Sequence, residues 1–216
     1  LQPNFSTALL IVVTAVGMLF VAGADIAQML IGAVVGSVSL GVLVRISPYR
    51  WNRVVTFITD PLRDPLGRGY QTARAIFALQ AGGLTGVGLG GSAQKMGLLY
   101  APHTDAIFAI IGEETGLLGC LLVIALYGLL AYRGLHIARR CKDPFGALLA
   151  TGITGGIVLQ AALHMAVVTA TVPFTGITLP LISFGGSSLV ATMAAVGLLL
   201  SISRGTAGAP AEVGVR

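Results

Sequence analysis

Charged residues are scarce in this chain of 216 residues, and that scarcity excludes an ordinary water-soluble domain. Asp, Glu, Lys and Arg together make up only 10% of the residues, whereas soluble domains carry about 25%. Hydrophobic residues account for 55% of the sequence, and the mean hydropathy is +0.90. We therefore expect a membrane protein, and no nucleic-acid partner.

Cysteine is rare as well, which argues against two further classes of protein. The chain has two cysteines, Cys120 inside an apolar run and Cys141 in a polar stretch. Cysteines placed in this way are not expected to form a disulfide, and their spacing matches no metal-ligand motif. The sequence thus predicts neither a disulfide-stapled scaffold nor a zinc domain.

Long apolar runs are what the chain has in abundance. The candidate spans cover about 5–23, 26–45, 106–132, 146–171 and 187–203, and a hydrocarbon core of ~30 Å needs about 20 such residues. We expect an all-α polytopic membrane domain over residues 1–204 and a disordered tail over 205–216. Because the chain begins with Leu1 and no charged leader precedes the first run, we expect a fragment of a longer membrane protein.

The distribution of cations predicts the orientation of these spans. The short connection 132–143 carries Arg133, Arg139, Arg140 and Lys142, which indicates the cytoplasmic side. Residues 46–104 then form a large extracytoplasmic loop containing short helices, although this loop is also basic. Two interpretations stay open: a long translocated loop that escapes the charge rule, or a basic surface retained to bind an anion.

A glycine-rich segment within that loop could be mistaken for a further span. Residues 75–94 carry no charge, but residues 82–91 include six glycines, each of which costs a helix about 1 kcal/mol relative to alanine. We therefore expect 75–94 to be a folded external or re-entrant loop. A phosphate cradle is the alternative, although no Walker pattern supports it.

Ionisable residues gather where this loop meets the third apolar run. His103, Thr104 and Asp105 precede the run directly, and Glu113 and Glu114 lie inside it. Ionisable groups within a membrane-length apolar segment are costly and mark a site by default. From the residues alone, Asp105 is either an N-terminal helix cap or a general base.

Helix geometry argues against a pair of catalytic carboxylates. On a continuous helix, Glu113 would lie about 12 Å deeper than Asp105, whereas paired glycosidase carboxylates lie roughly 5–9.5 Å apart. We expect Glu113 and Glu114 to belong instead to a structural polar network. Gln160 and His164 join that network, because residues four apart share one helix face.

Short motifs spread along the chain carry a resemblance to one family. They are QPNFST at 2–7, SPYR at 47–50, DPLGRGYQ at 64–71, GVGLGGSAQK at 86–95, HTD at 103–105, GEE at 112–114, PFTG at 173–176 and LPLISFGGSS at 179–188. On these motifs the chain resembles the SEDS family (shape, elongation, division and sporulation), which includes FtsW, RodA and SpoVE. The residues of the motifs SPYR and GLGGSAQK are closer to those of the FtsW and SpoVE type.

The resemblance implies a bundle of roughly ten helices, of which this chain would be the C-terminal five transmembrane helices. It implies a peptidoglycan glycosyltransferase that polymerises lipid II into glycan strands and releases undecaprenyl pyrophosphate. The reaction would take place on the extracytoplasmic face of the bacterial cytoplasmic (inner) membrane, in cell division or cell-shape maintenance. The implied partners are a class B penicillin-binding transpeptidase and other divisome or elongasome proteins.

Within this resemblance, Asp105 is the implied catalytic base. The expected substrate- and diphosphate-binding residues are Arg50, Arg68, Arg74, Lys95, His103, Thr104, Thr175, Ser183 and Ser187. Arginine suits bidentate contact with phosphate. A divalent cation, Mg²⁺ or Mn²⁺, is an open alternative for neutralising the diphosphate, although no ligand cluster in the sequence demands one.

The chain departs from the family pattern at a few positions. The family usually has a glutamate just before the HTD triplet, where this chain reads YAP, and an asparagine where this chain has His164; Asn4 replaces an aspartate. Two rival functions are a lipid II flippase or transporter and a non-catalytic divisome scaffold. A flippase needs a polar path across the bilayer, whereas the polar groups of this chain gather on one side.

Overall fold

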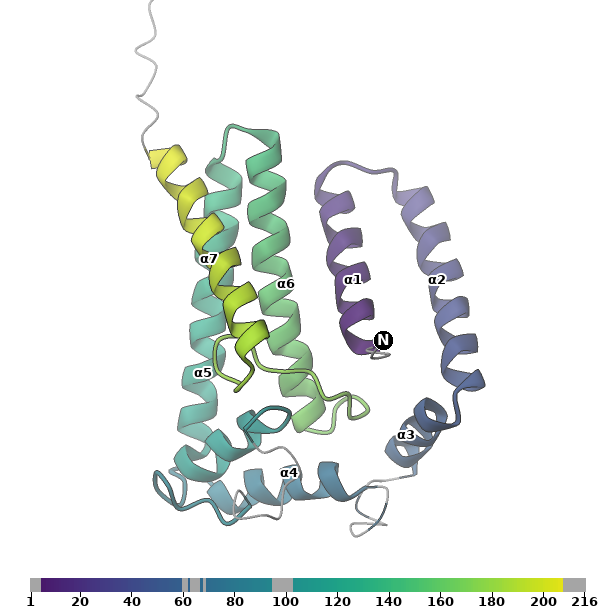
Figure 1. Ribbon diagram of the computed structural model, residues 1–216, viewed down its shortest axis with the longest axis vertical. Coiled ribbons are helices and arrows are strands. Elements are labelled where there is room, and N and C mark those ends of the chain that lie inside the picture. The colour runs from purple at the N-terminus through teal and green to yellow at the C-terminus, as the bar shows by residue number, and fades with distance from the viewer. Residues whose placement is uncertain (1–4, 60–61, 63–66, 68, 95–102, 208–216) are drawn as a thin grey trace, which may run out of the picture.

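Seven α-helices make up the described part of the chain. The computed structural model describes residues 5–59, 62, 67, 69–94 and 103–207. The helices are α1 (Phe5–Val21), α2 (Ile26–Ile46), α3 (Pro48–Ile58), α4 (Tyr70–Gly82), α5 (Ile107–Arg140), α6 (Pro144–Val168) and α7 (Gly186–Ala207) (Figure 1). The described residues contain no strand, so the predicted all-α class is confirmed.

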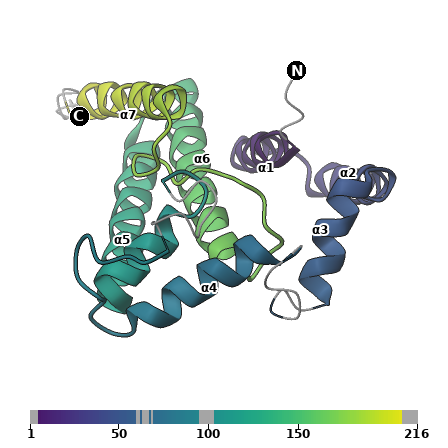
Figure 2. The same cartoon turned by 60° about the horizontal axis from the view of Figure 1, so that its bottom comes forward.

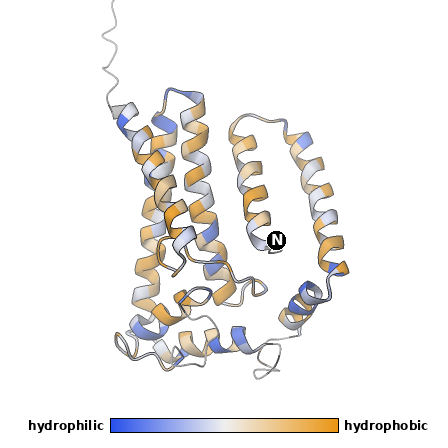
Figure 3. Ribbon diagram, viewed as in Figure 1, coloured by the Kyte–Doolittle hydropathy of each residue, from blue (hydrophilic) through white to orange (hydrophobic). Residues whose placement is uncertain are grey.

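Four of these helices, α2, α5, α6 and α7, are long and apolar enough to cross a membrane, and α1 is a shorter apolar helix. Hydrophobic residues predominate along these helices, and many hydrophilic residues lie toward the ends of the bundle (Figure 3). The short helices expected in the segment 46–104 are α3 and α4. The chain is therefore a multi-pass membrane protein.

Helix α5 is longer than the predicted span 106–132. Its 34 residues include a break at Gly116, and it ends at Arg140 rather than at 132. Arg133, Arg139 and Arg140 therefore lie on the last turns of α5 rather than in a loop, and residues 141–143 alone connect α5 to α6. Likewise α7 continues to Ala207, beyond the predicted end at 203 and into the first residues of the predicted tail.

Helices α5, α6 and α7 form the packed part of the molecule, with α1 against α6 and α2 on the outside (Figure 1). Helix α4 lies across one end of α5 and α6 (Figure 2). The main core cluster joins α4, α5 and α6 through Ala75, Ala78, Phe108, Ala109, Cys120, Val123, Tyr127, Ile157, Ala161 and Val168, with Leu179 from the loop before α7. Small residues in this cluster allow the helices to approach closely.

A break in α5 receives the glycine-rich loop that follows α4. Gly116 has φ 68° and ψ −163°, a positive φ that glycine adopts without steric cost. At the break, Val87 N donates to Glu113 O at 3.0 Å, and Leu117 N donates to Gly83 O at 2.9 Å. The loop thereby satisfies backbone groups that the interrupted helix leaves free.

The structure corrects the expectation of a loop over 75–94, because residues 75–82 are helical and belong to α4. Beyond α4, Gly86 packs against α5, and a Cβ on it would collide with the carbonyl of Glu114. Gly88 N donates to Glu114 O at 3.1 Å. Since the N–H groups of Val87 and Gly88 are bound to protein carbonyls, the geometry does not favour a phosphate cradle here.

Candidate active site

Asp105 lies in the turn 103–106 that leads into α5. The interpretation of Asp105 as a helix cap is wrong, because the N-cap of α5 is Ala106 and no side chain caps the helix. Its half-buried carboxylate lies instead against the loop that joins α6 to α7. Asp105 Oδ2 is 3.1 Å from the position that a Cβ on Gly176 would occupy.

Hydrogen bonds fix the backbone beside Asp105 to that same loop. Phe184 N donates to His103 O at 2.8 Å, and Ser183 Oγ donates to Thr104 O at 2.7 Å. Ser183 Oγ also accepts from Leu179 N at 2.7 Å, and the residue is buried. The Ser183 hydroxyl therefore joins the turn 103–106 to the α6–α7 loop. We call His103, Thr104 and Ser183 the frame around Asp105.

Gln160 and His164 hold the other side of the loop. His164 Nδ1 lies 2.6 Å from Ile177 O, and Gln160 Nε2 donates to Thr178 O at 2.9 Å. The two side chains share one face of α6, as the four-residue spacing predicted. Each bonds to the loop rather than to the other, so together they fix the stretch that follows Gly176.

The predicted polar network is divided between two places. Glu113 is 2% exposed, and its carboxylate accepts hydrogen bonds from Ser92 Oγ and from Ala93 N, the latter at 3.1 Å. Glu113 thus holds the end of the glycine-rich loop against α5, while His164 binds the α6–α7 loop beside Asp105. Glu114 is half-buried at the break in α5.

Arg53 is a site residue that the sequence analysis missed. Its Nη1 donates to Phe174 O at 2.7 Å, and its guanidinium lies over the rings of Tyr49 and Phe174 at 4.6 and 5.6 Å. The four-residue spacing of Tyr49 and Arg53 on α3 was the available signal. Arg50, the predicted residue, instead donates from Nη1 to Leu43 O of α2 at 3.3 Å.

The remaining predicted residues occupy varied positions. Arg74 on α4 lies over the ring of Tyr70 at 5.2 Å. The buried Nε of Arg74 and the buried Oγ1 of Thr175 have no hydrogen-bond partner in the described part of the chain. Ser187 is exposed at the start of α7. The predictions for Arg68 and Lys95 lie outside the described residues.

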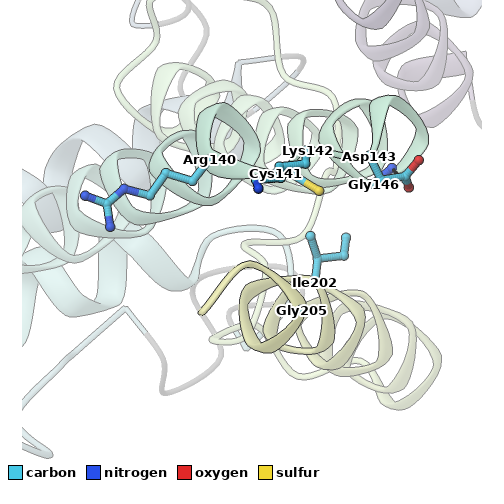
Figure 4. Close-up of a pocket in the computed structure, with 7 residues that line it drawn as sticks. All are labelled: Arg140, Cys141, Lys142, Asp143, Gly146, Ile202 and Gly205. Carbon is cyan, nitrogen blue, oxygen red and sulfur yellow. Dashed lines mark hydrogen bonds between the residues drawn. The ribbon is translucent and has the colours of Figure 1, made fainter. Parts of the chain in front are cut away.

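A separate cavity of about 390 Å³ lies where the α5–α6 connection meets the end of α7 (Figure 4). It is lined by Arg140, Cys141, Lys142, Asp143, Gly146, Ile202 and Gly205. The Asp143 carboxylate there is engaged as the cap of α6, accepting from Gly146 N at 2.8 Å. This cavity lies at the opposite end of the bundle from the start of α5 (Figure 1), so it is distinct from the Asp105 site.

The arrangement around Asp105 suits proton transfer by a single carboxylate. The residue is half-buried, and the two residues before it, His103 and Thr104, are hydrogen-bonded to the α6–α7 loop, which fixes the backbone that carries a candidate general base. Among the described residues, no three His, Cys, Asp or Glu side chains cluster as metal ligands.

Comparison with known proteins gives consistent results. The model of the FtsW/RodA/SpoVE family, described as cell cycle protein, matches residues 1–208. A probable peptidoglycan glycosyltransferase FtsW of Alkalilimnicola ehrlichii is 46% identical over 93% of this chain and 51% of its own length. The stage V sporulation protein E of Bacillus subtilis is 43% identical over 94% of this chain and 55% of its own length.

Two solved structures are similar as well. One, from a study of the coordination of polymerization and crosslinking by a peptidoglycan synthase complex, has a TM-score of 0.76 and 30% identity, covering 96% of this chain and 58% of the other. The other, a variant of the Thermus thermophilus rod shape determining protein RodA, has a TM-score of 0.60 and 28% identity, covering 94% and 51%. The chain spans about half the length of the curated relatives that it matches.

Proposed function

The chain belongs to the FtsW/RodA/SpoVE family, and we propose that the protein containing it is a peptidoglycan glycosyltransferase. Its substrate is lipid II, its product is a glycan strand, and undecaprenyl pyrophosphate is the leaving group. The proposal is supported by relatives named peptidoglycan glycosyltransferase FtsW and by the pre-organised carboxylate of Asp105. That carboxylate is the observation that carries the proposed chemistry.

In the proposed reaction, Asp105 acts as the general base. It takes the proton from the acceptor sugar hydroxyl as the hydroxyl oxygen attacks the anomeric carbon of the lipid-linked donor. The bond from that carbon to the diphosphate breaks, and the electron pair leaves with the diphosphate. The frame formed by His103, Thr104 and Ser183 holds Asp105 in position during this step, so little reorganisation is needed.

Cations at the same end of the molecule would stabilise the negative charge that develops on the diphosphate. Arg74 is the described candidate whose Nε is not committed to a protein acceptor, and Arg68 and Lys95 remain predictions. Arg53 supplies positive charge beside Phe174 while it fixes the loop. Mg²⁺ or Mn²⁺ bound to the diphosphate would share this role.

The proposed location is the bacterial inner membrane, with the Asp105 end on the extracytoplasmic face. The cations Arg133, Arg139, Arg140, Lys142 and Arg204 lie at the other end of the bundle, which supports a cytoplasmic assignment for that end. A class B penicillin-binding protein is the proposed partner. The similarity to a chain from a peptidoglycan synthase complex supports this partner.

Polymerisation of labelled lipid II by the purified intact protein, together with its partner, tests the proposal. Asp105→Asn keeps the size of the side chain but cannot accept the proton at the same basicity, so we expect a loss of about 10²–10⁴-fold in rate. Equal polymer from wild type and Asp105→Asn would favour a non-catalytic scaffold. Absence of polymer from both, combined with lipid transfer across vesicles, would favour a flippase.

A further inference from the structure

His164 presents a buried ring nitrogen whose role the fold does not explain. The side chain is 1% exposed, and its Nδ1 lies 2.6 Å from the carbonyl oxygen of Ile177. A carbonyl oxygen can only accept, so Nδ1 carries the hydrogen in this contact. In the neutral ring, Nε2 is then a lone-pair acceptor, and within the described residues it has no hydrogen-bond partner.

Asp105 and His164 meet the same short stretch of the loop between α6 and α7. Asp105 Oδ2 lies beside Gly176, and His164 bonds to the next residue, Ile177. The charge of Asp105 also acts electrostatically on the imidazole of His164. Asp105 and His164 therefore contact adjacent residues of this loop.

Two other charged side chains of the described region have partners of their own. The Glu113 carboxylate is occupied by Ser92 and Ala93, and the Arg53 guanidinium binds Phe174 O. The Thr175 hydroxyl is close in sequence but, like Nε2, has no hydrogen bond, so the two are not bonded to each other. Asp105 is thus the group nearby whose chemistry changes during the proposed reaction.

The protonation state of Asp105 decides whether the two side chains can bond. An ionised carboxylate has only acceptors, as has Nε2 of the neutral ring, so the two cannot share a hydrogen bond. Once Asp105 has taken a proton it becomes a donor, and Nε2 can accept from it, directly or through one water molecule. Such a hydrogen bond stabilises protonated Asp105 but not ionised Asp105. It therefore stabilises the transition state of glycosyl transfer, in which the proton moves to Asp105, more than the ground state.

We propose that His164 is a positioning residue for Asp105, whose Nε2 accepts a hydrogen bond from the carboxyl group that Asp105 becomes during glycosyl transfer. The O–H bond of the acceptor sugar breaks as its oxygen bonds to the anomeric carbon, and the bond to the diphosphate breaks with its electron pair. The proton ends on Asp105, held toward Nε2. This inference rests on the proposed function.

Two variants separate the two nitrogens of the ring. His164→Asn can place its amide nitrogen near the position of Nδ1 and keep the bond to Ile177, but it has no atom at the position of Nε2. The SEDS resemblance has asparagine at this position, so we expect that variant to fold. His164→Gln reaches the position of Nε2 with an amide oxygen that can accept, but it loses the bond to Ile177.

The test uses initial rates with saturating labelled lipid II, and thermal unfolding, on the intact protein with its partner. His164→Asn is expected to lower kcat about tenfold, with KM almost unchanged and with a smaller loss of Tm than in His164→Gln. His164→Gln is expected to retain more of kcat although its Tm is lower. If His164 has only a structural role, the variant with the higher Tm should also have the higher kcat, so that the rate follows Tm in both variants.

Two results would overturn the inference: an unchanged kcat in His164→Asn, or rates that follow Tm in both variants. If the wild-type protein makes polymer in that experiment, the proposed function stands and the role of His164 alone is rejected. If the wild-type protein makes no polymer, the proposed function fails and the inference fails with it.

Discussion

The contact between Glu113 and the glycine-rich loop allows a stability prediction whose size can be worked from the structure. Ser92 is 2% exposed, so Glu113→Ala removes a buried hydrogen bond from its hydroxyl to a charged acceptor, at a cost of about 1.5–3 kcal/mol. Ala93 is exposed, so the loss of its bond costs only about 0.5–1.5 kcal/mol. We therefore expect Glu113→Ala to lower the free energy of unfolding by about 2–4.5 kcal/mol.

The assay is thermal unfolding of the intact protein in detergent, where such a loss lowers Tm by several degrees. Ser92→Ala should also destabilise, because among the described residues the buried carboxylate then keeps only Ala93 N as a donor. Ser187→Ala is the matched control, since Ser187 is exposed, and it should leave Tm unchanged.

A double-mutant cycle makes the prediction specific to this contact. In Ser92→Ala/Glu113→Ala both partners are absent, so the double variant should lose less than the sum of the single variants, by about 1–2 kcal/mol. Strict additivity, or a Tm for Glu113→Ala equal to that of wild type, would refute the reasoning that the carboxylate anchors this loop.

Two further predictions follow from close contacts elsewhere in the site region. Gly86→Ala should lower Tm because the added Cβ meets the carbonyl of Glu114 at a backbone φ of +80°; Gly36→Ala, with open space around it, should not, and equal Tm values would contradict this account. Arg53→Lys keeps the charge but loses the planar guanidinium that binds Phe174 O, and should slow lipid II polymerisation about tenfold. A wild-type rate in Arg53→Lys would show that this contact does not position the loop beside Asp105.

The sequence by itself determined the class of protein and the approximate places of its apolar helices. A run of about 20 apolar residues predicts a membrane helix, because backbone N–H and C=O groups without hydrogen bonds are too costly in lipid. The glycines at 82–91 likewise predicted a departure from regular helix, although α4 continues to Gly82. Asp105 was predicted as a candidate site residue because a carboxylate at the edge of an apolar run is unusual, and its catalytic role was implied by the family resemblance.

The tertiary structure alone decided how the polar side chains are used. The bonds from Arg53 to Phe174 and from Ser183 to Thr104 join residues 121 and 79 positions apart, and no local pattern encodes such pairs. The positive φ of Gly116 interrupts α5, and the glycine-rich loop packs at this break. Glu113 binds that loop, whereas His164 binds the loop between α6 and α7. Composition and periodicity describe a helix face, whereas the partner of a polar atom is set by which distant segment packs against that face.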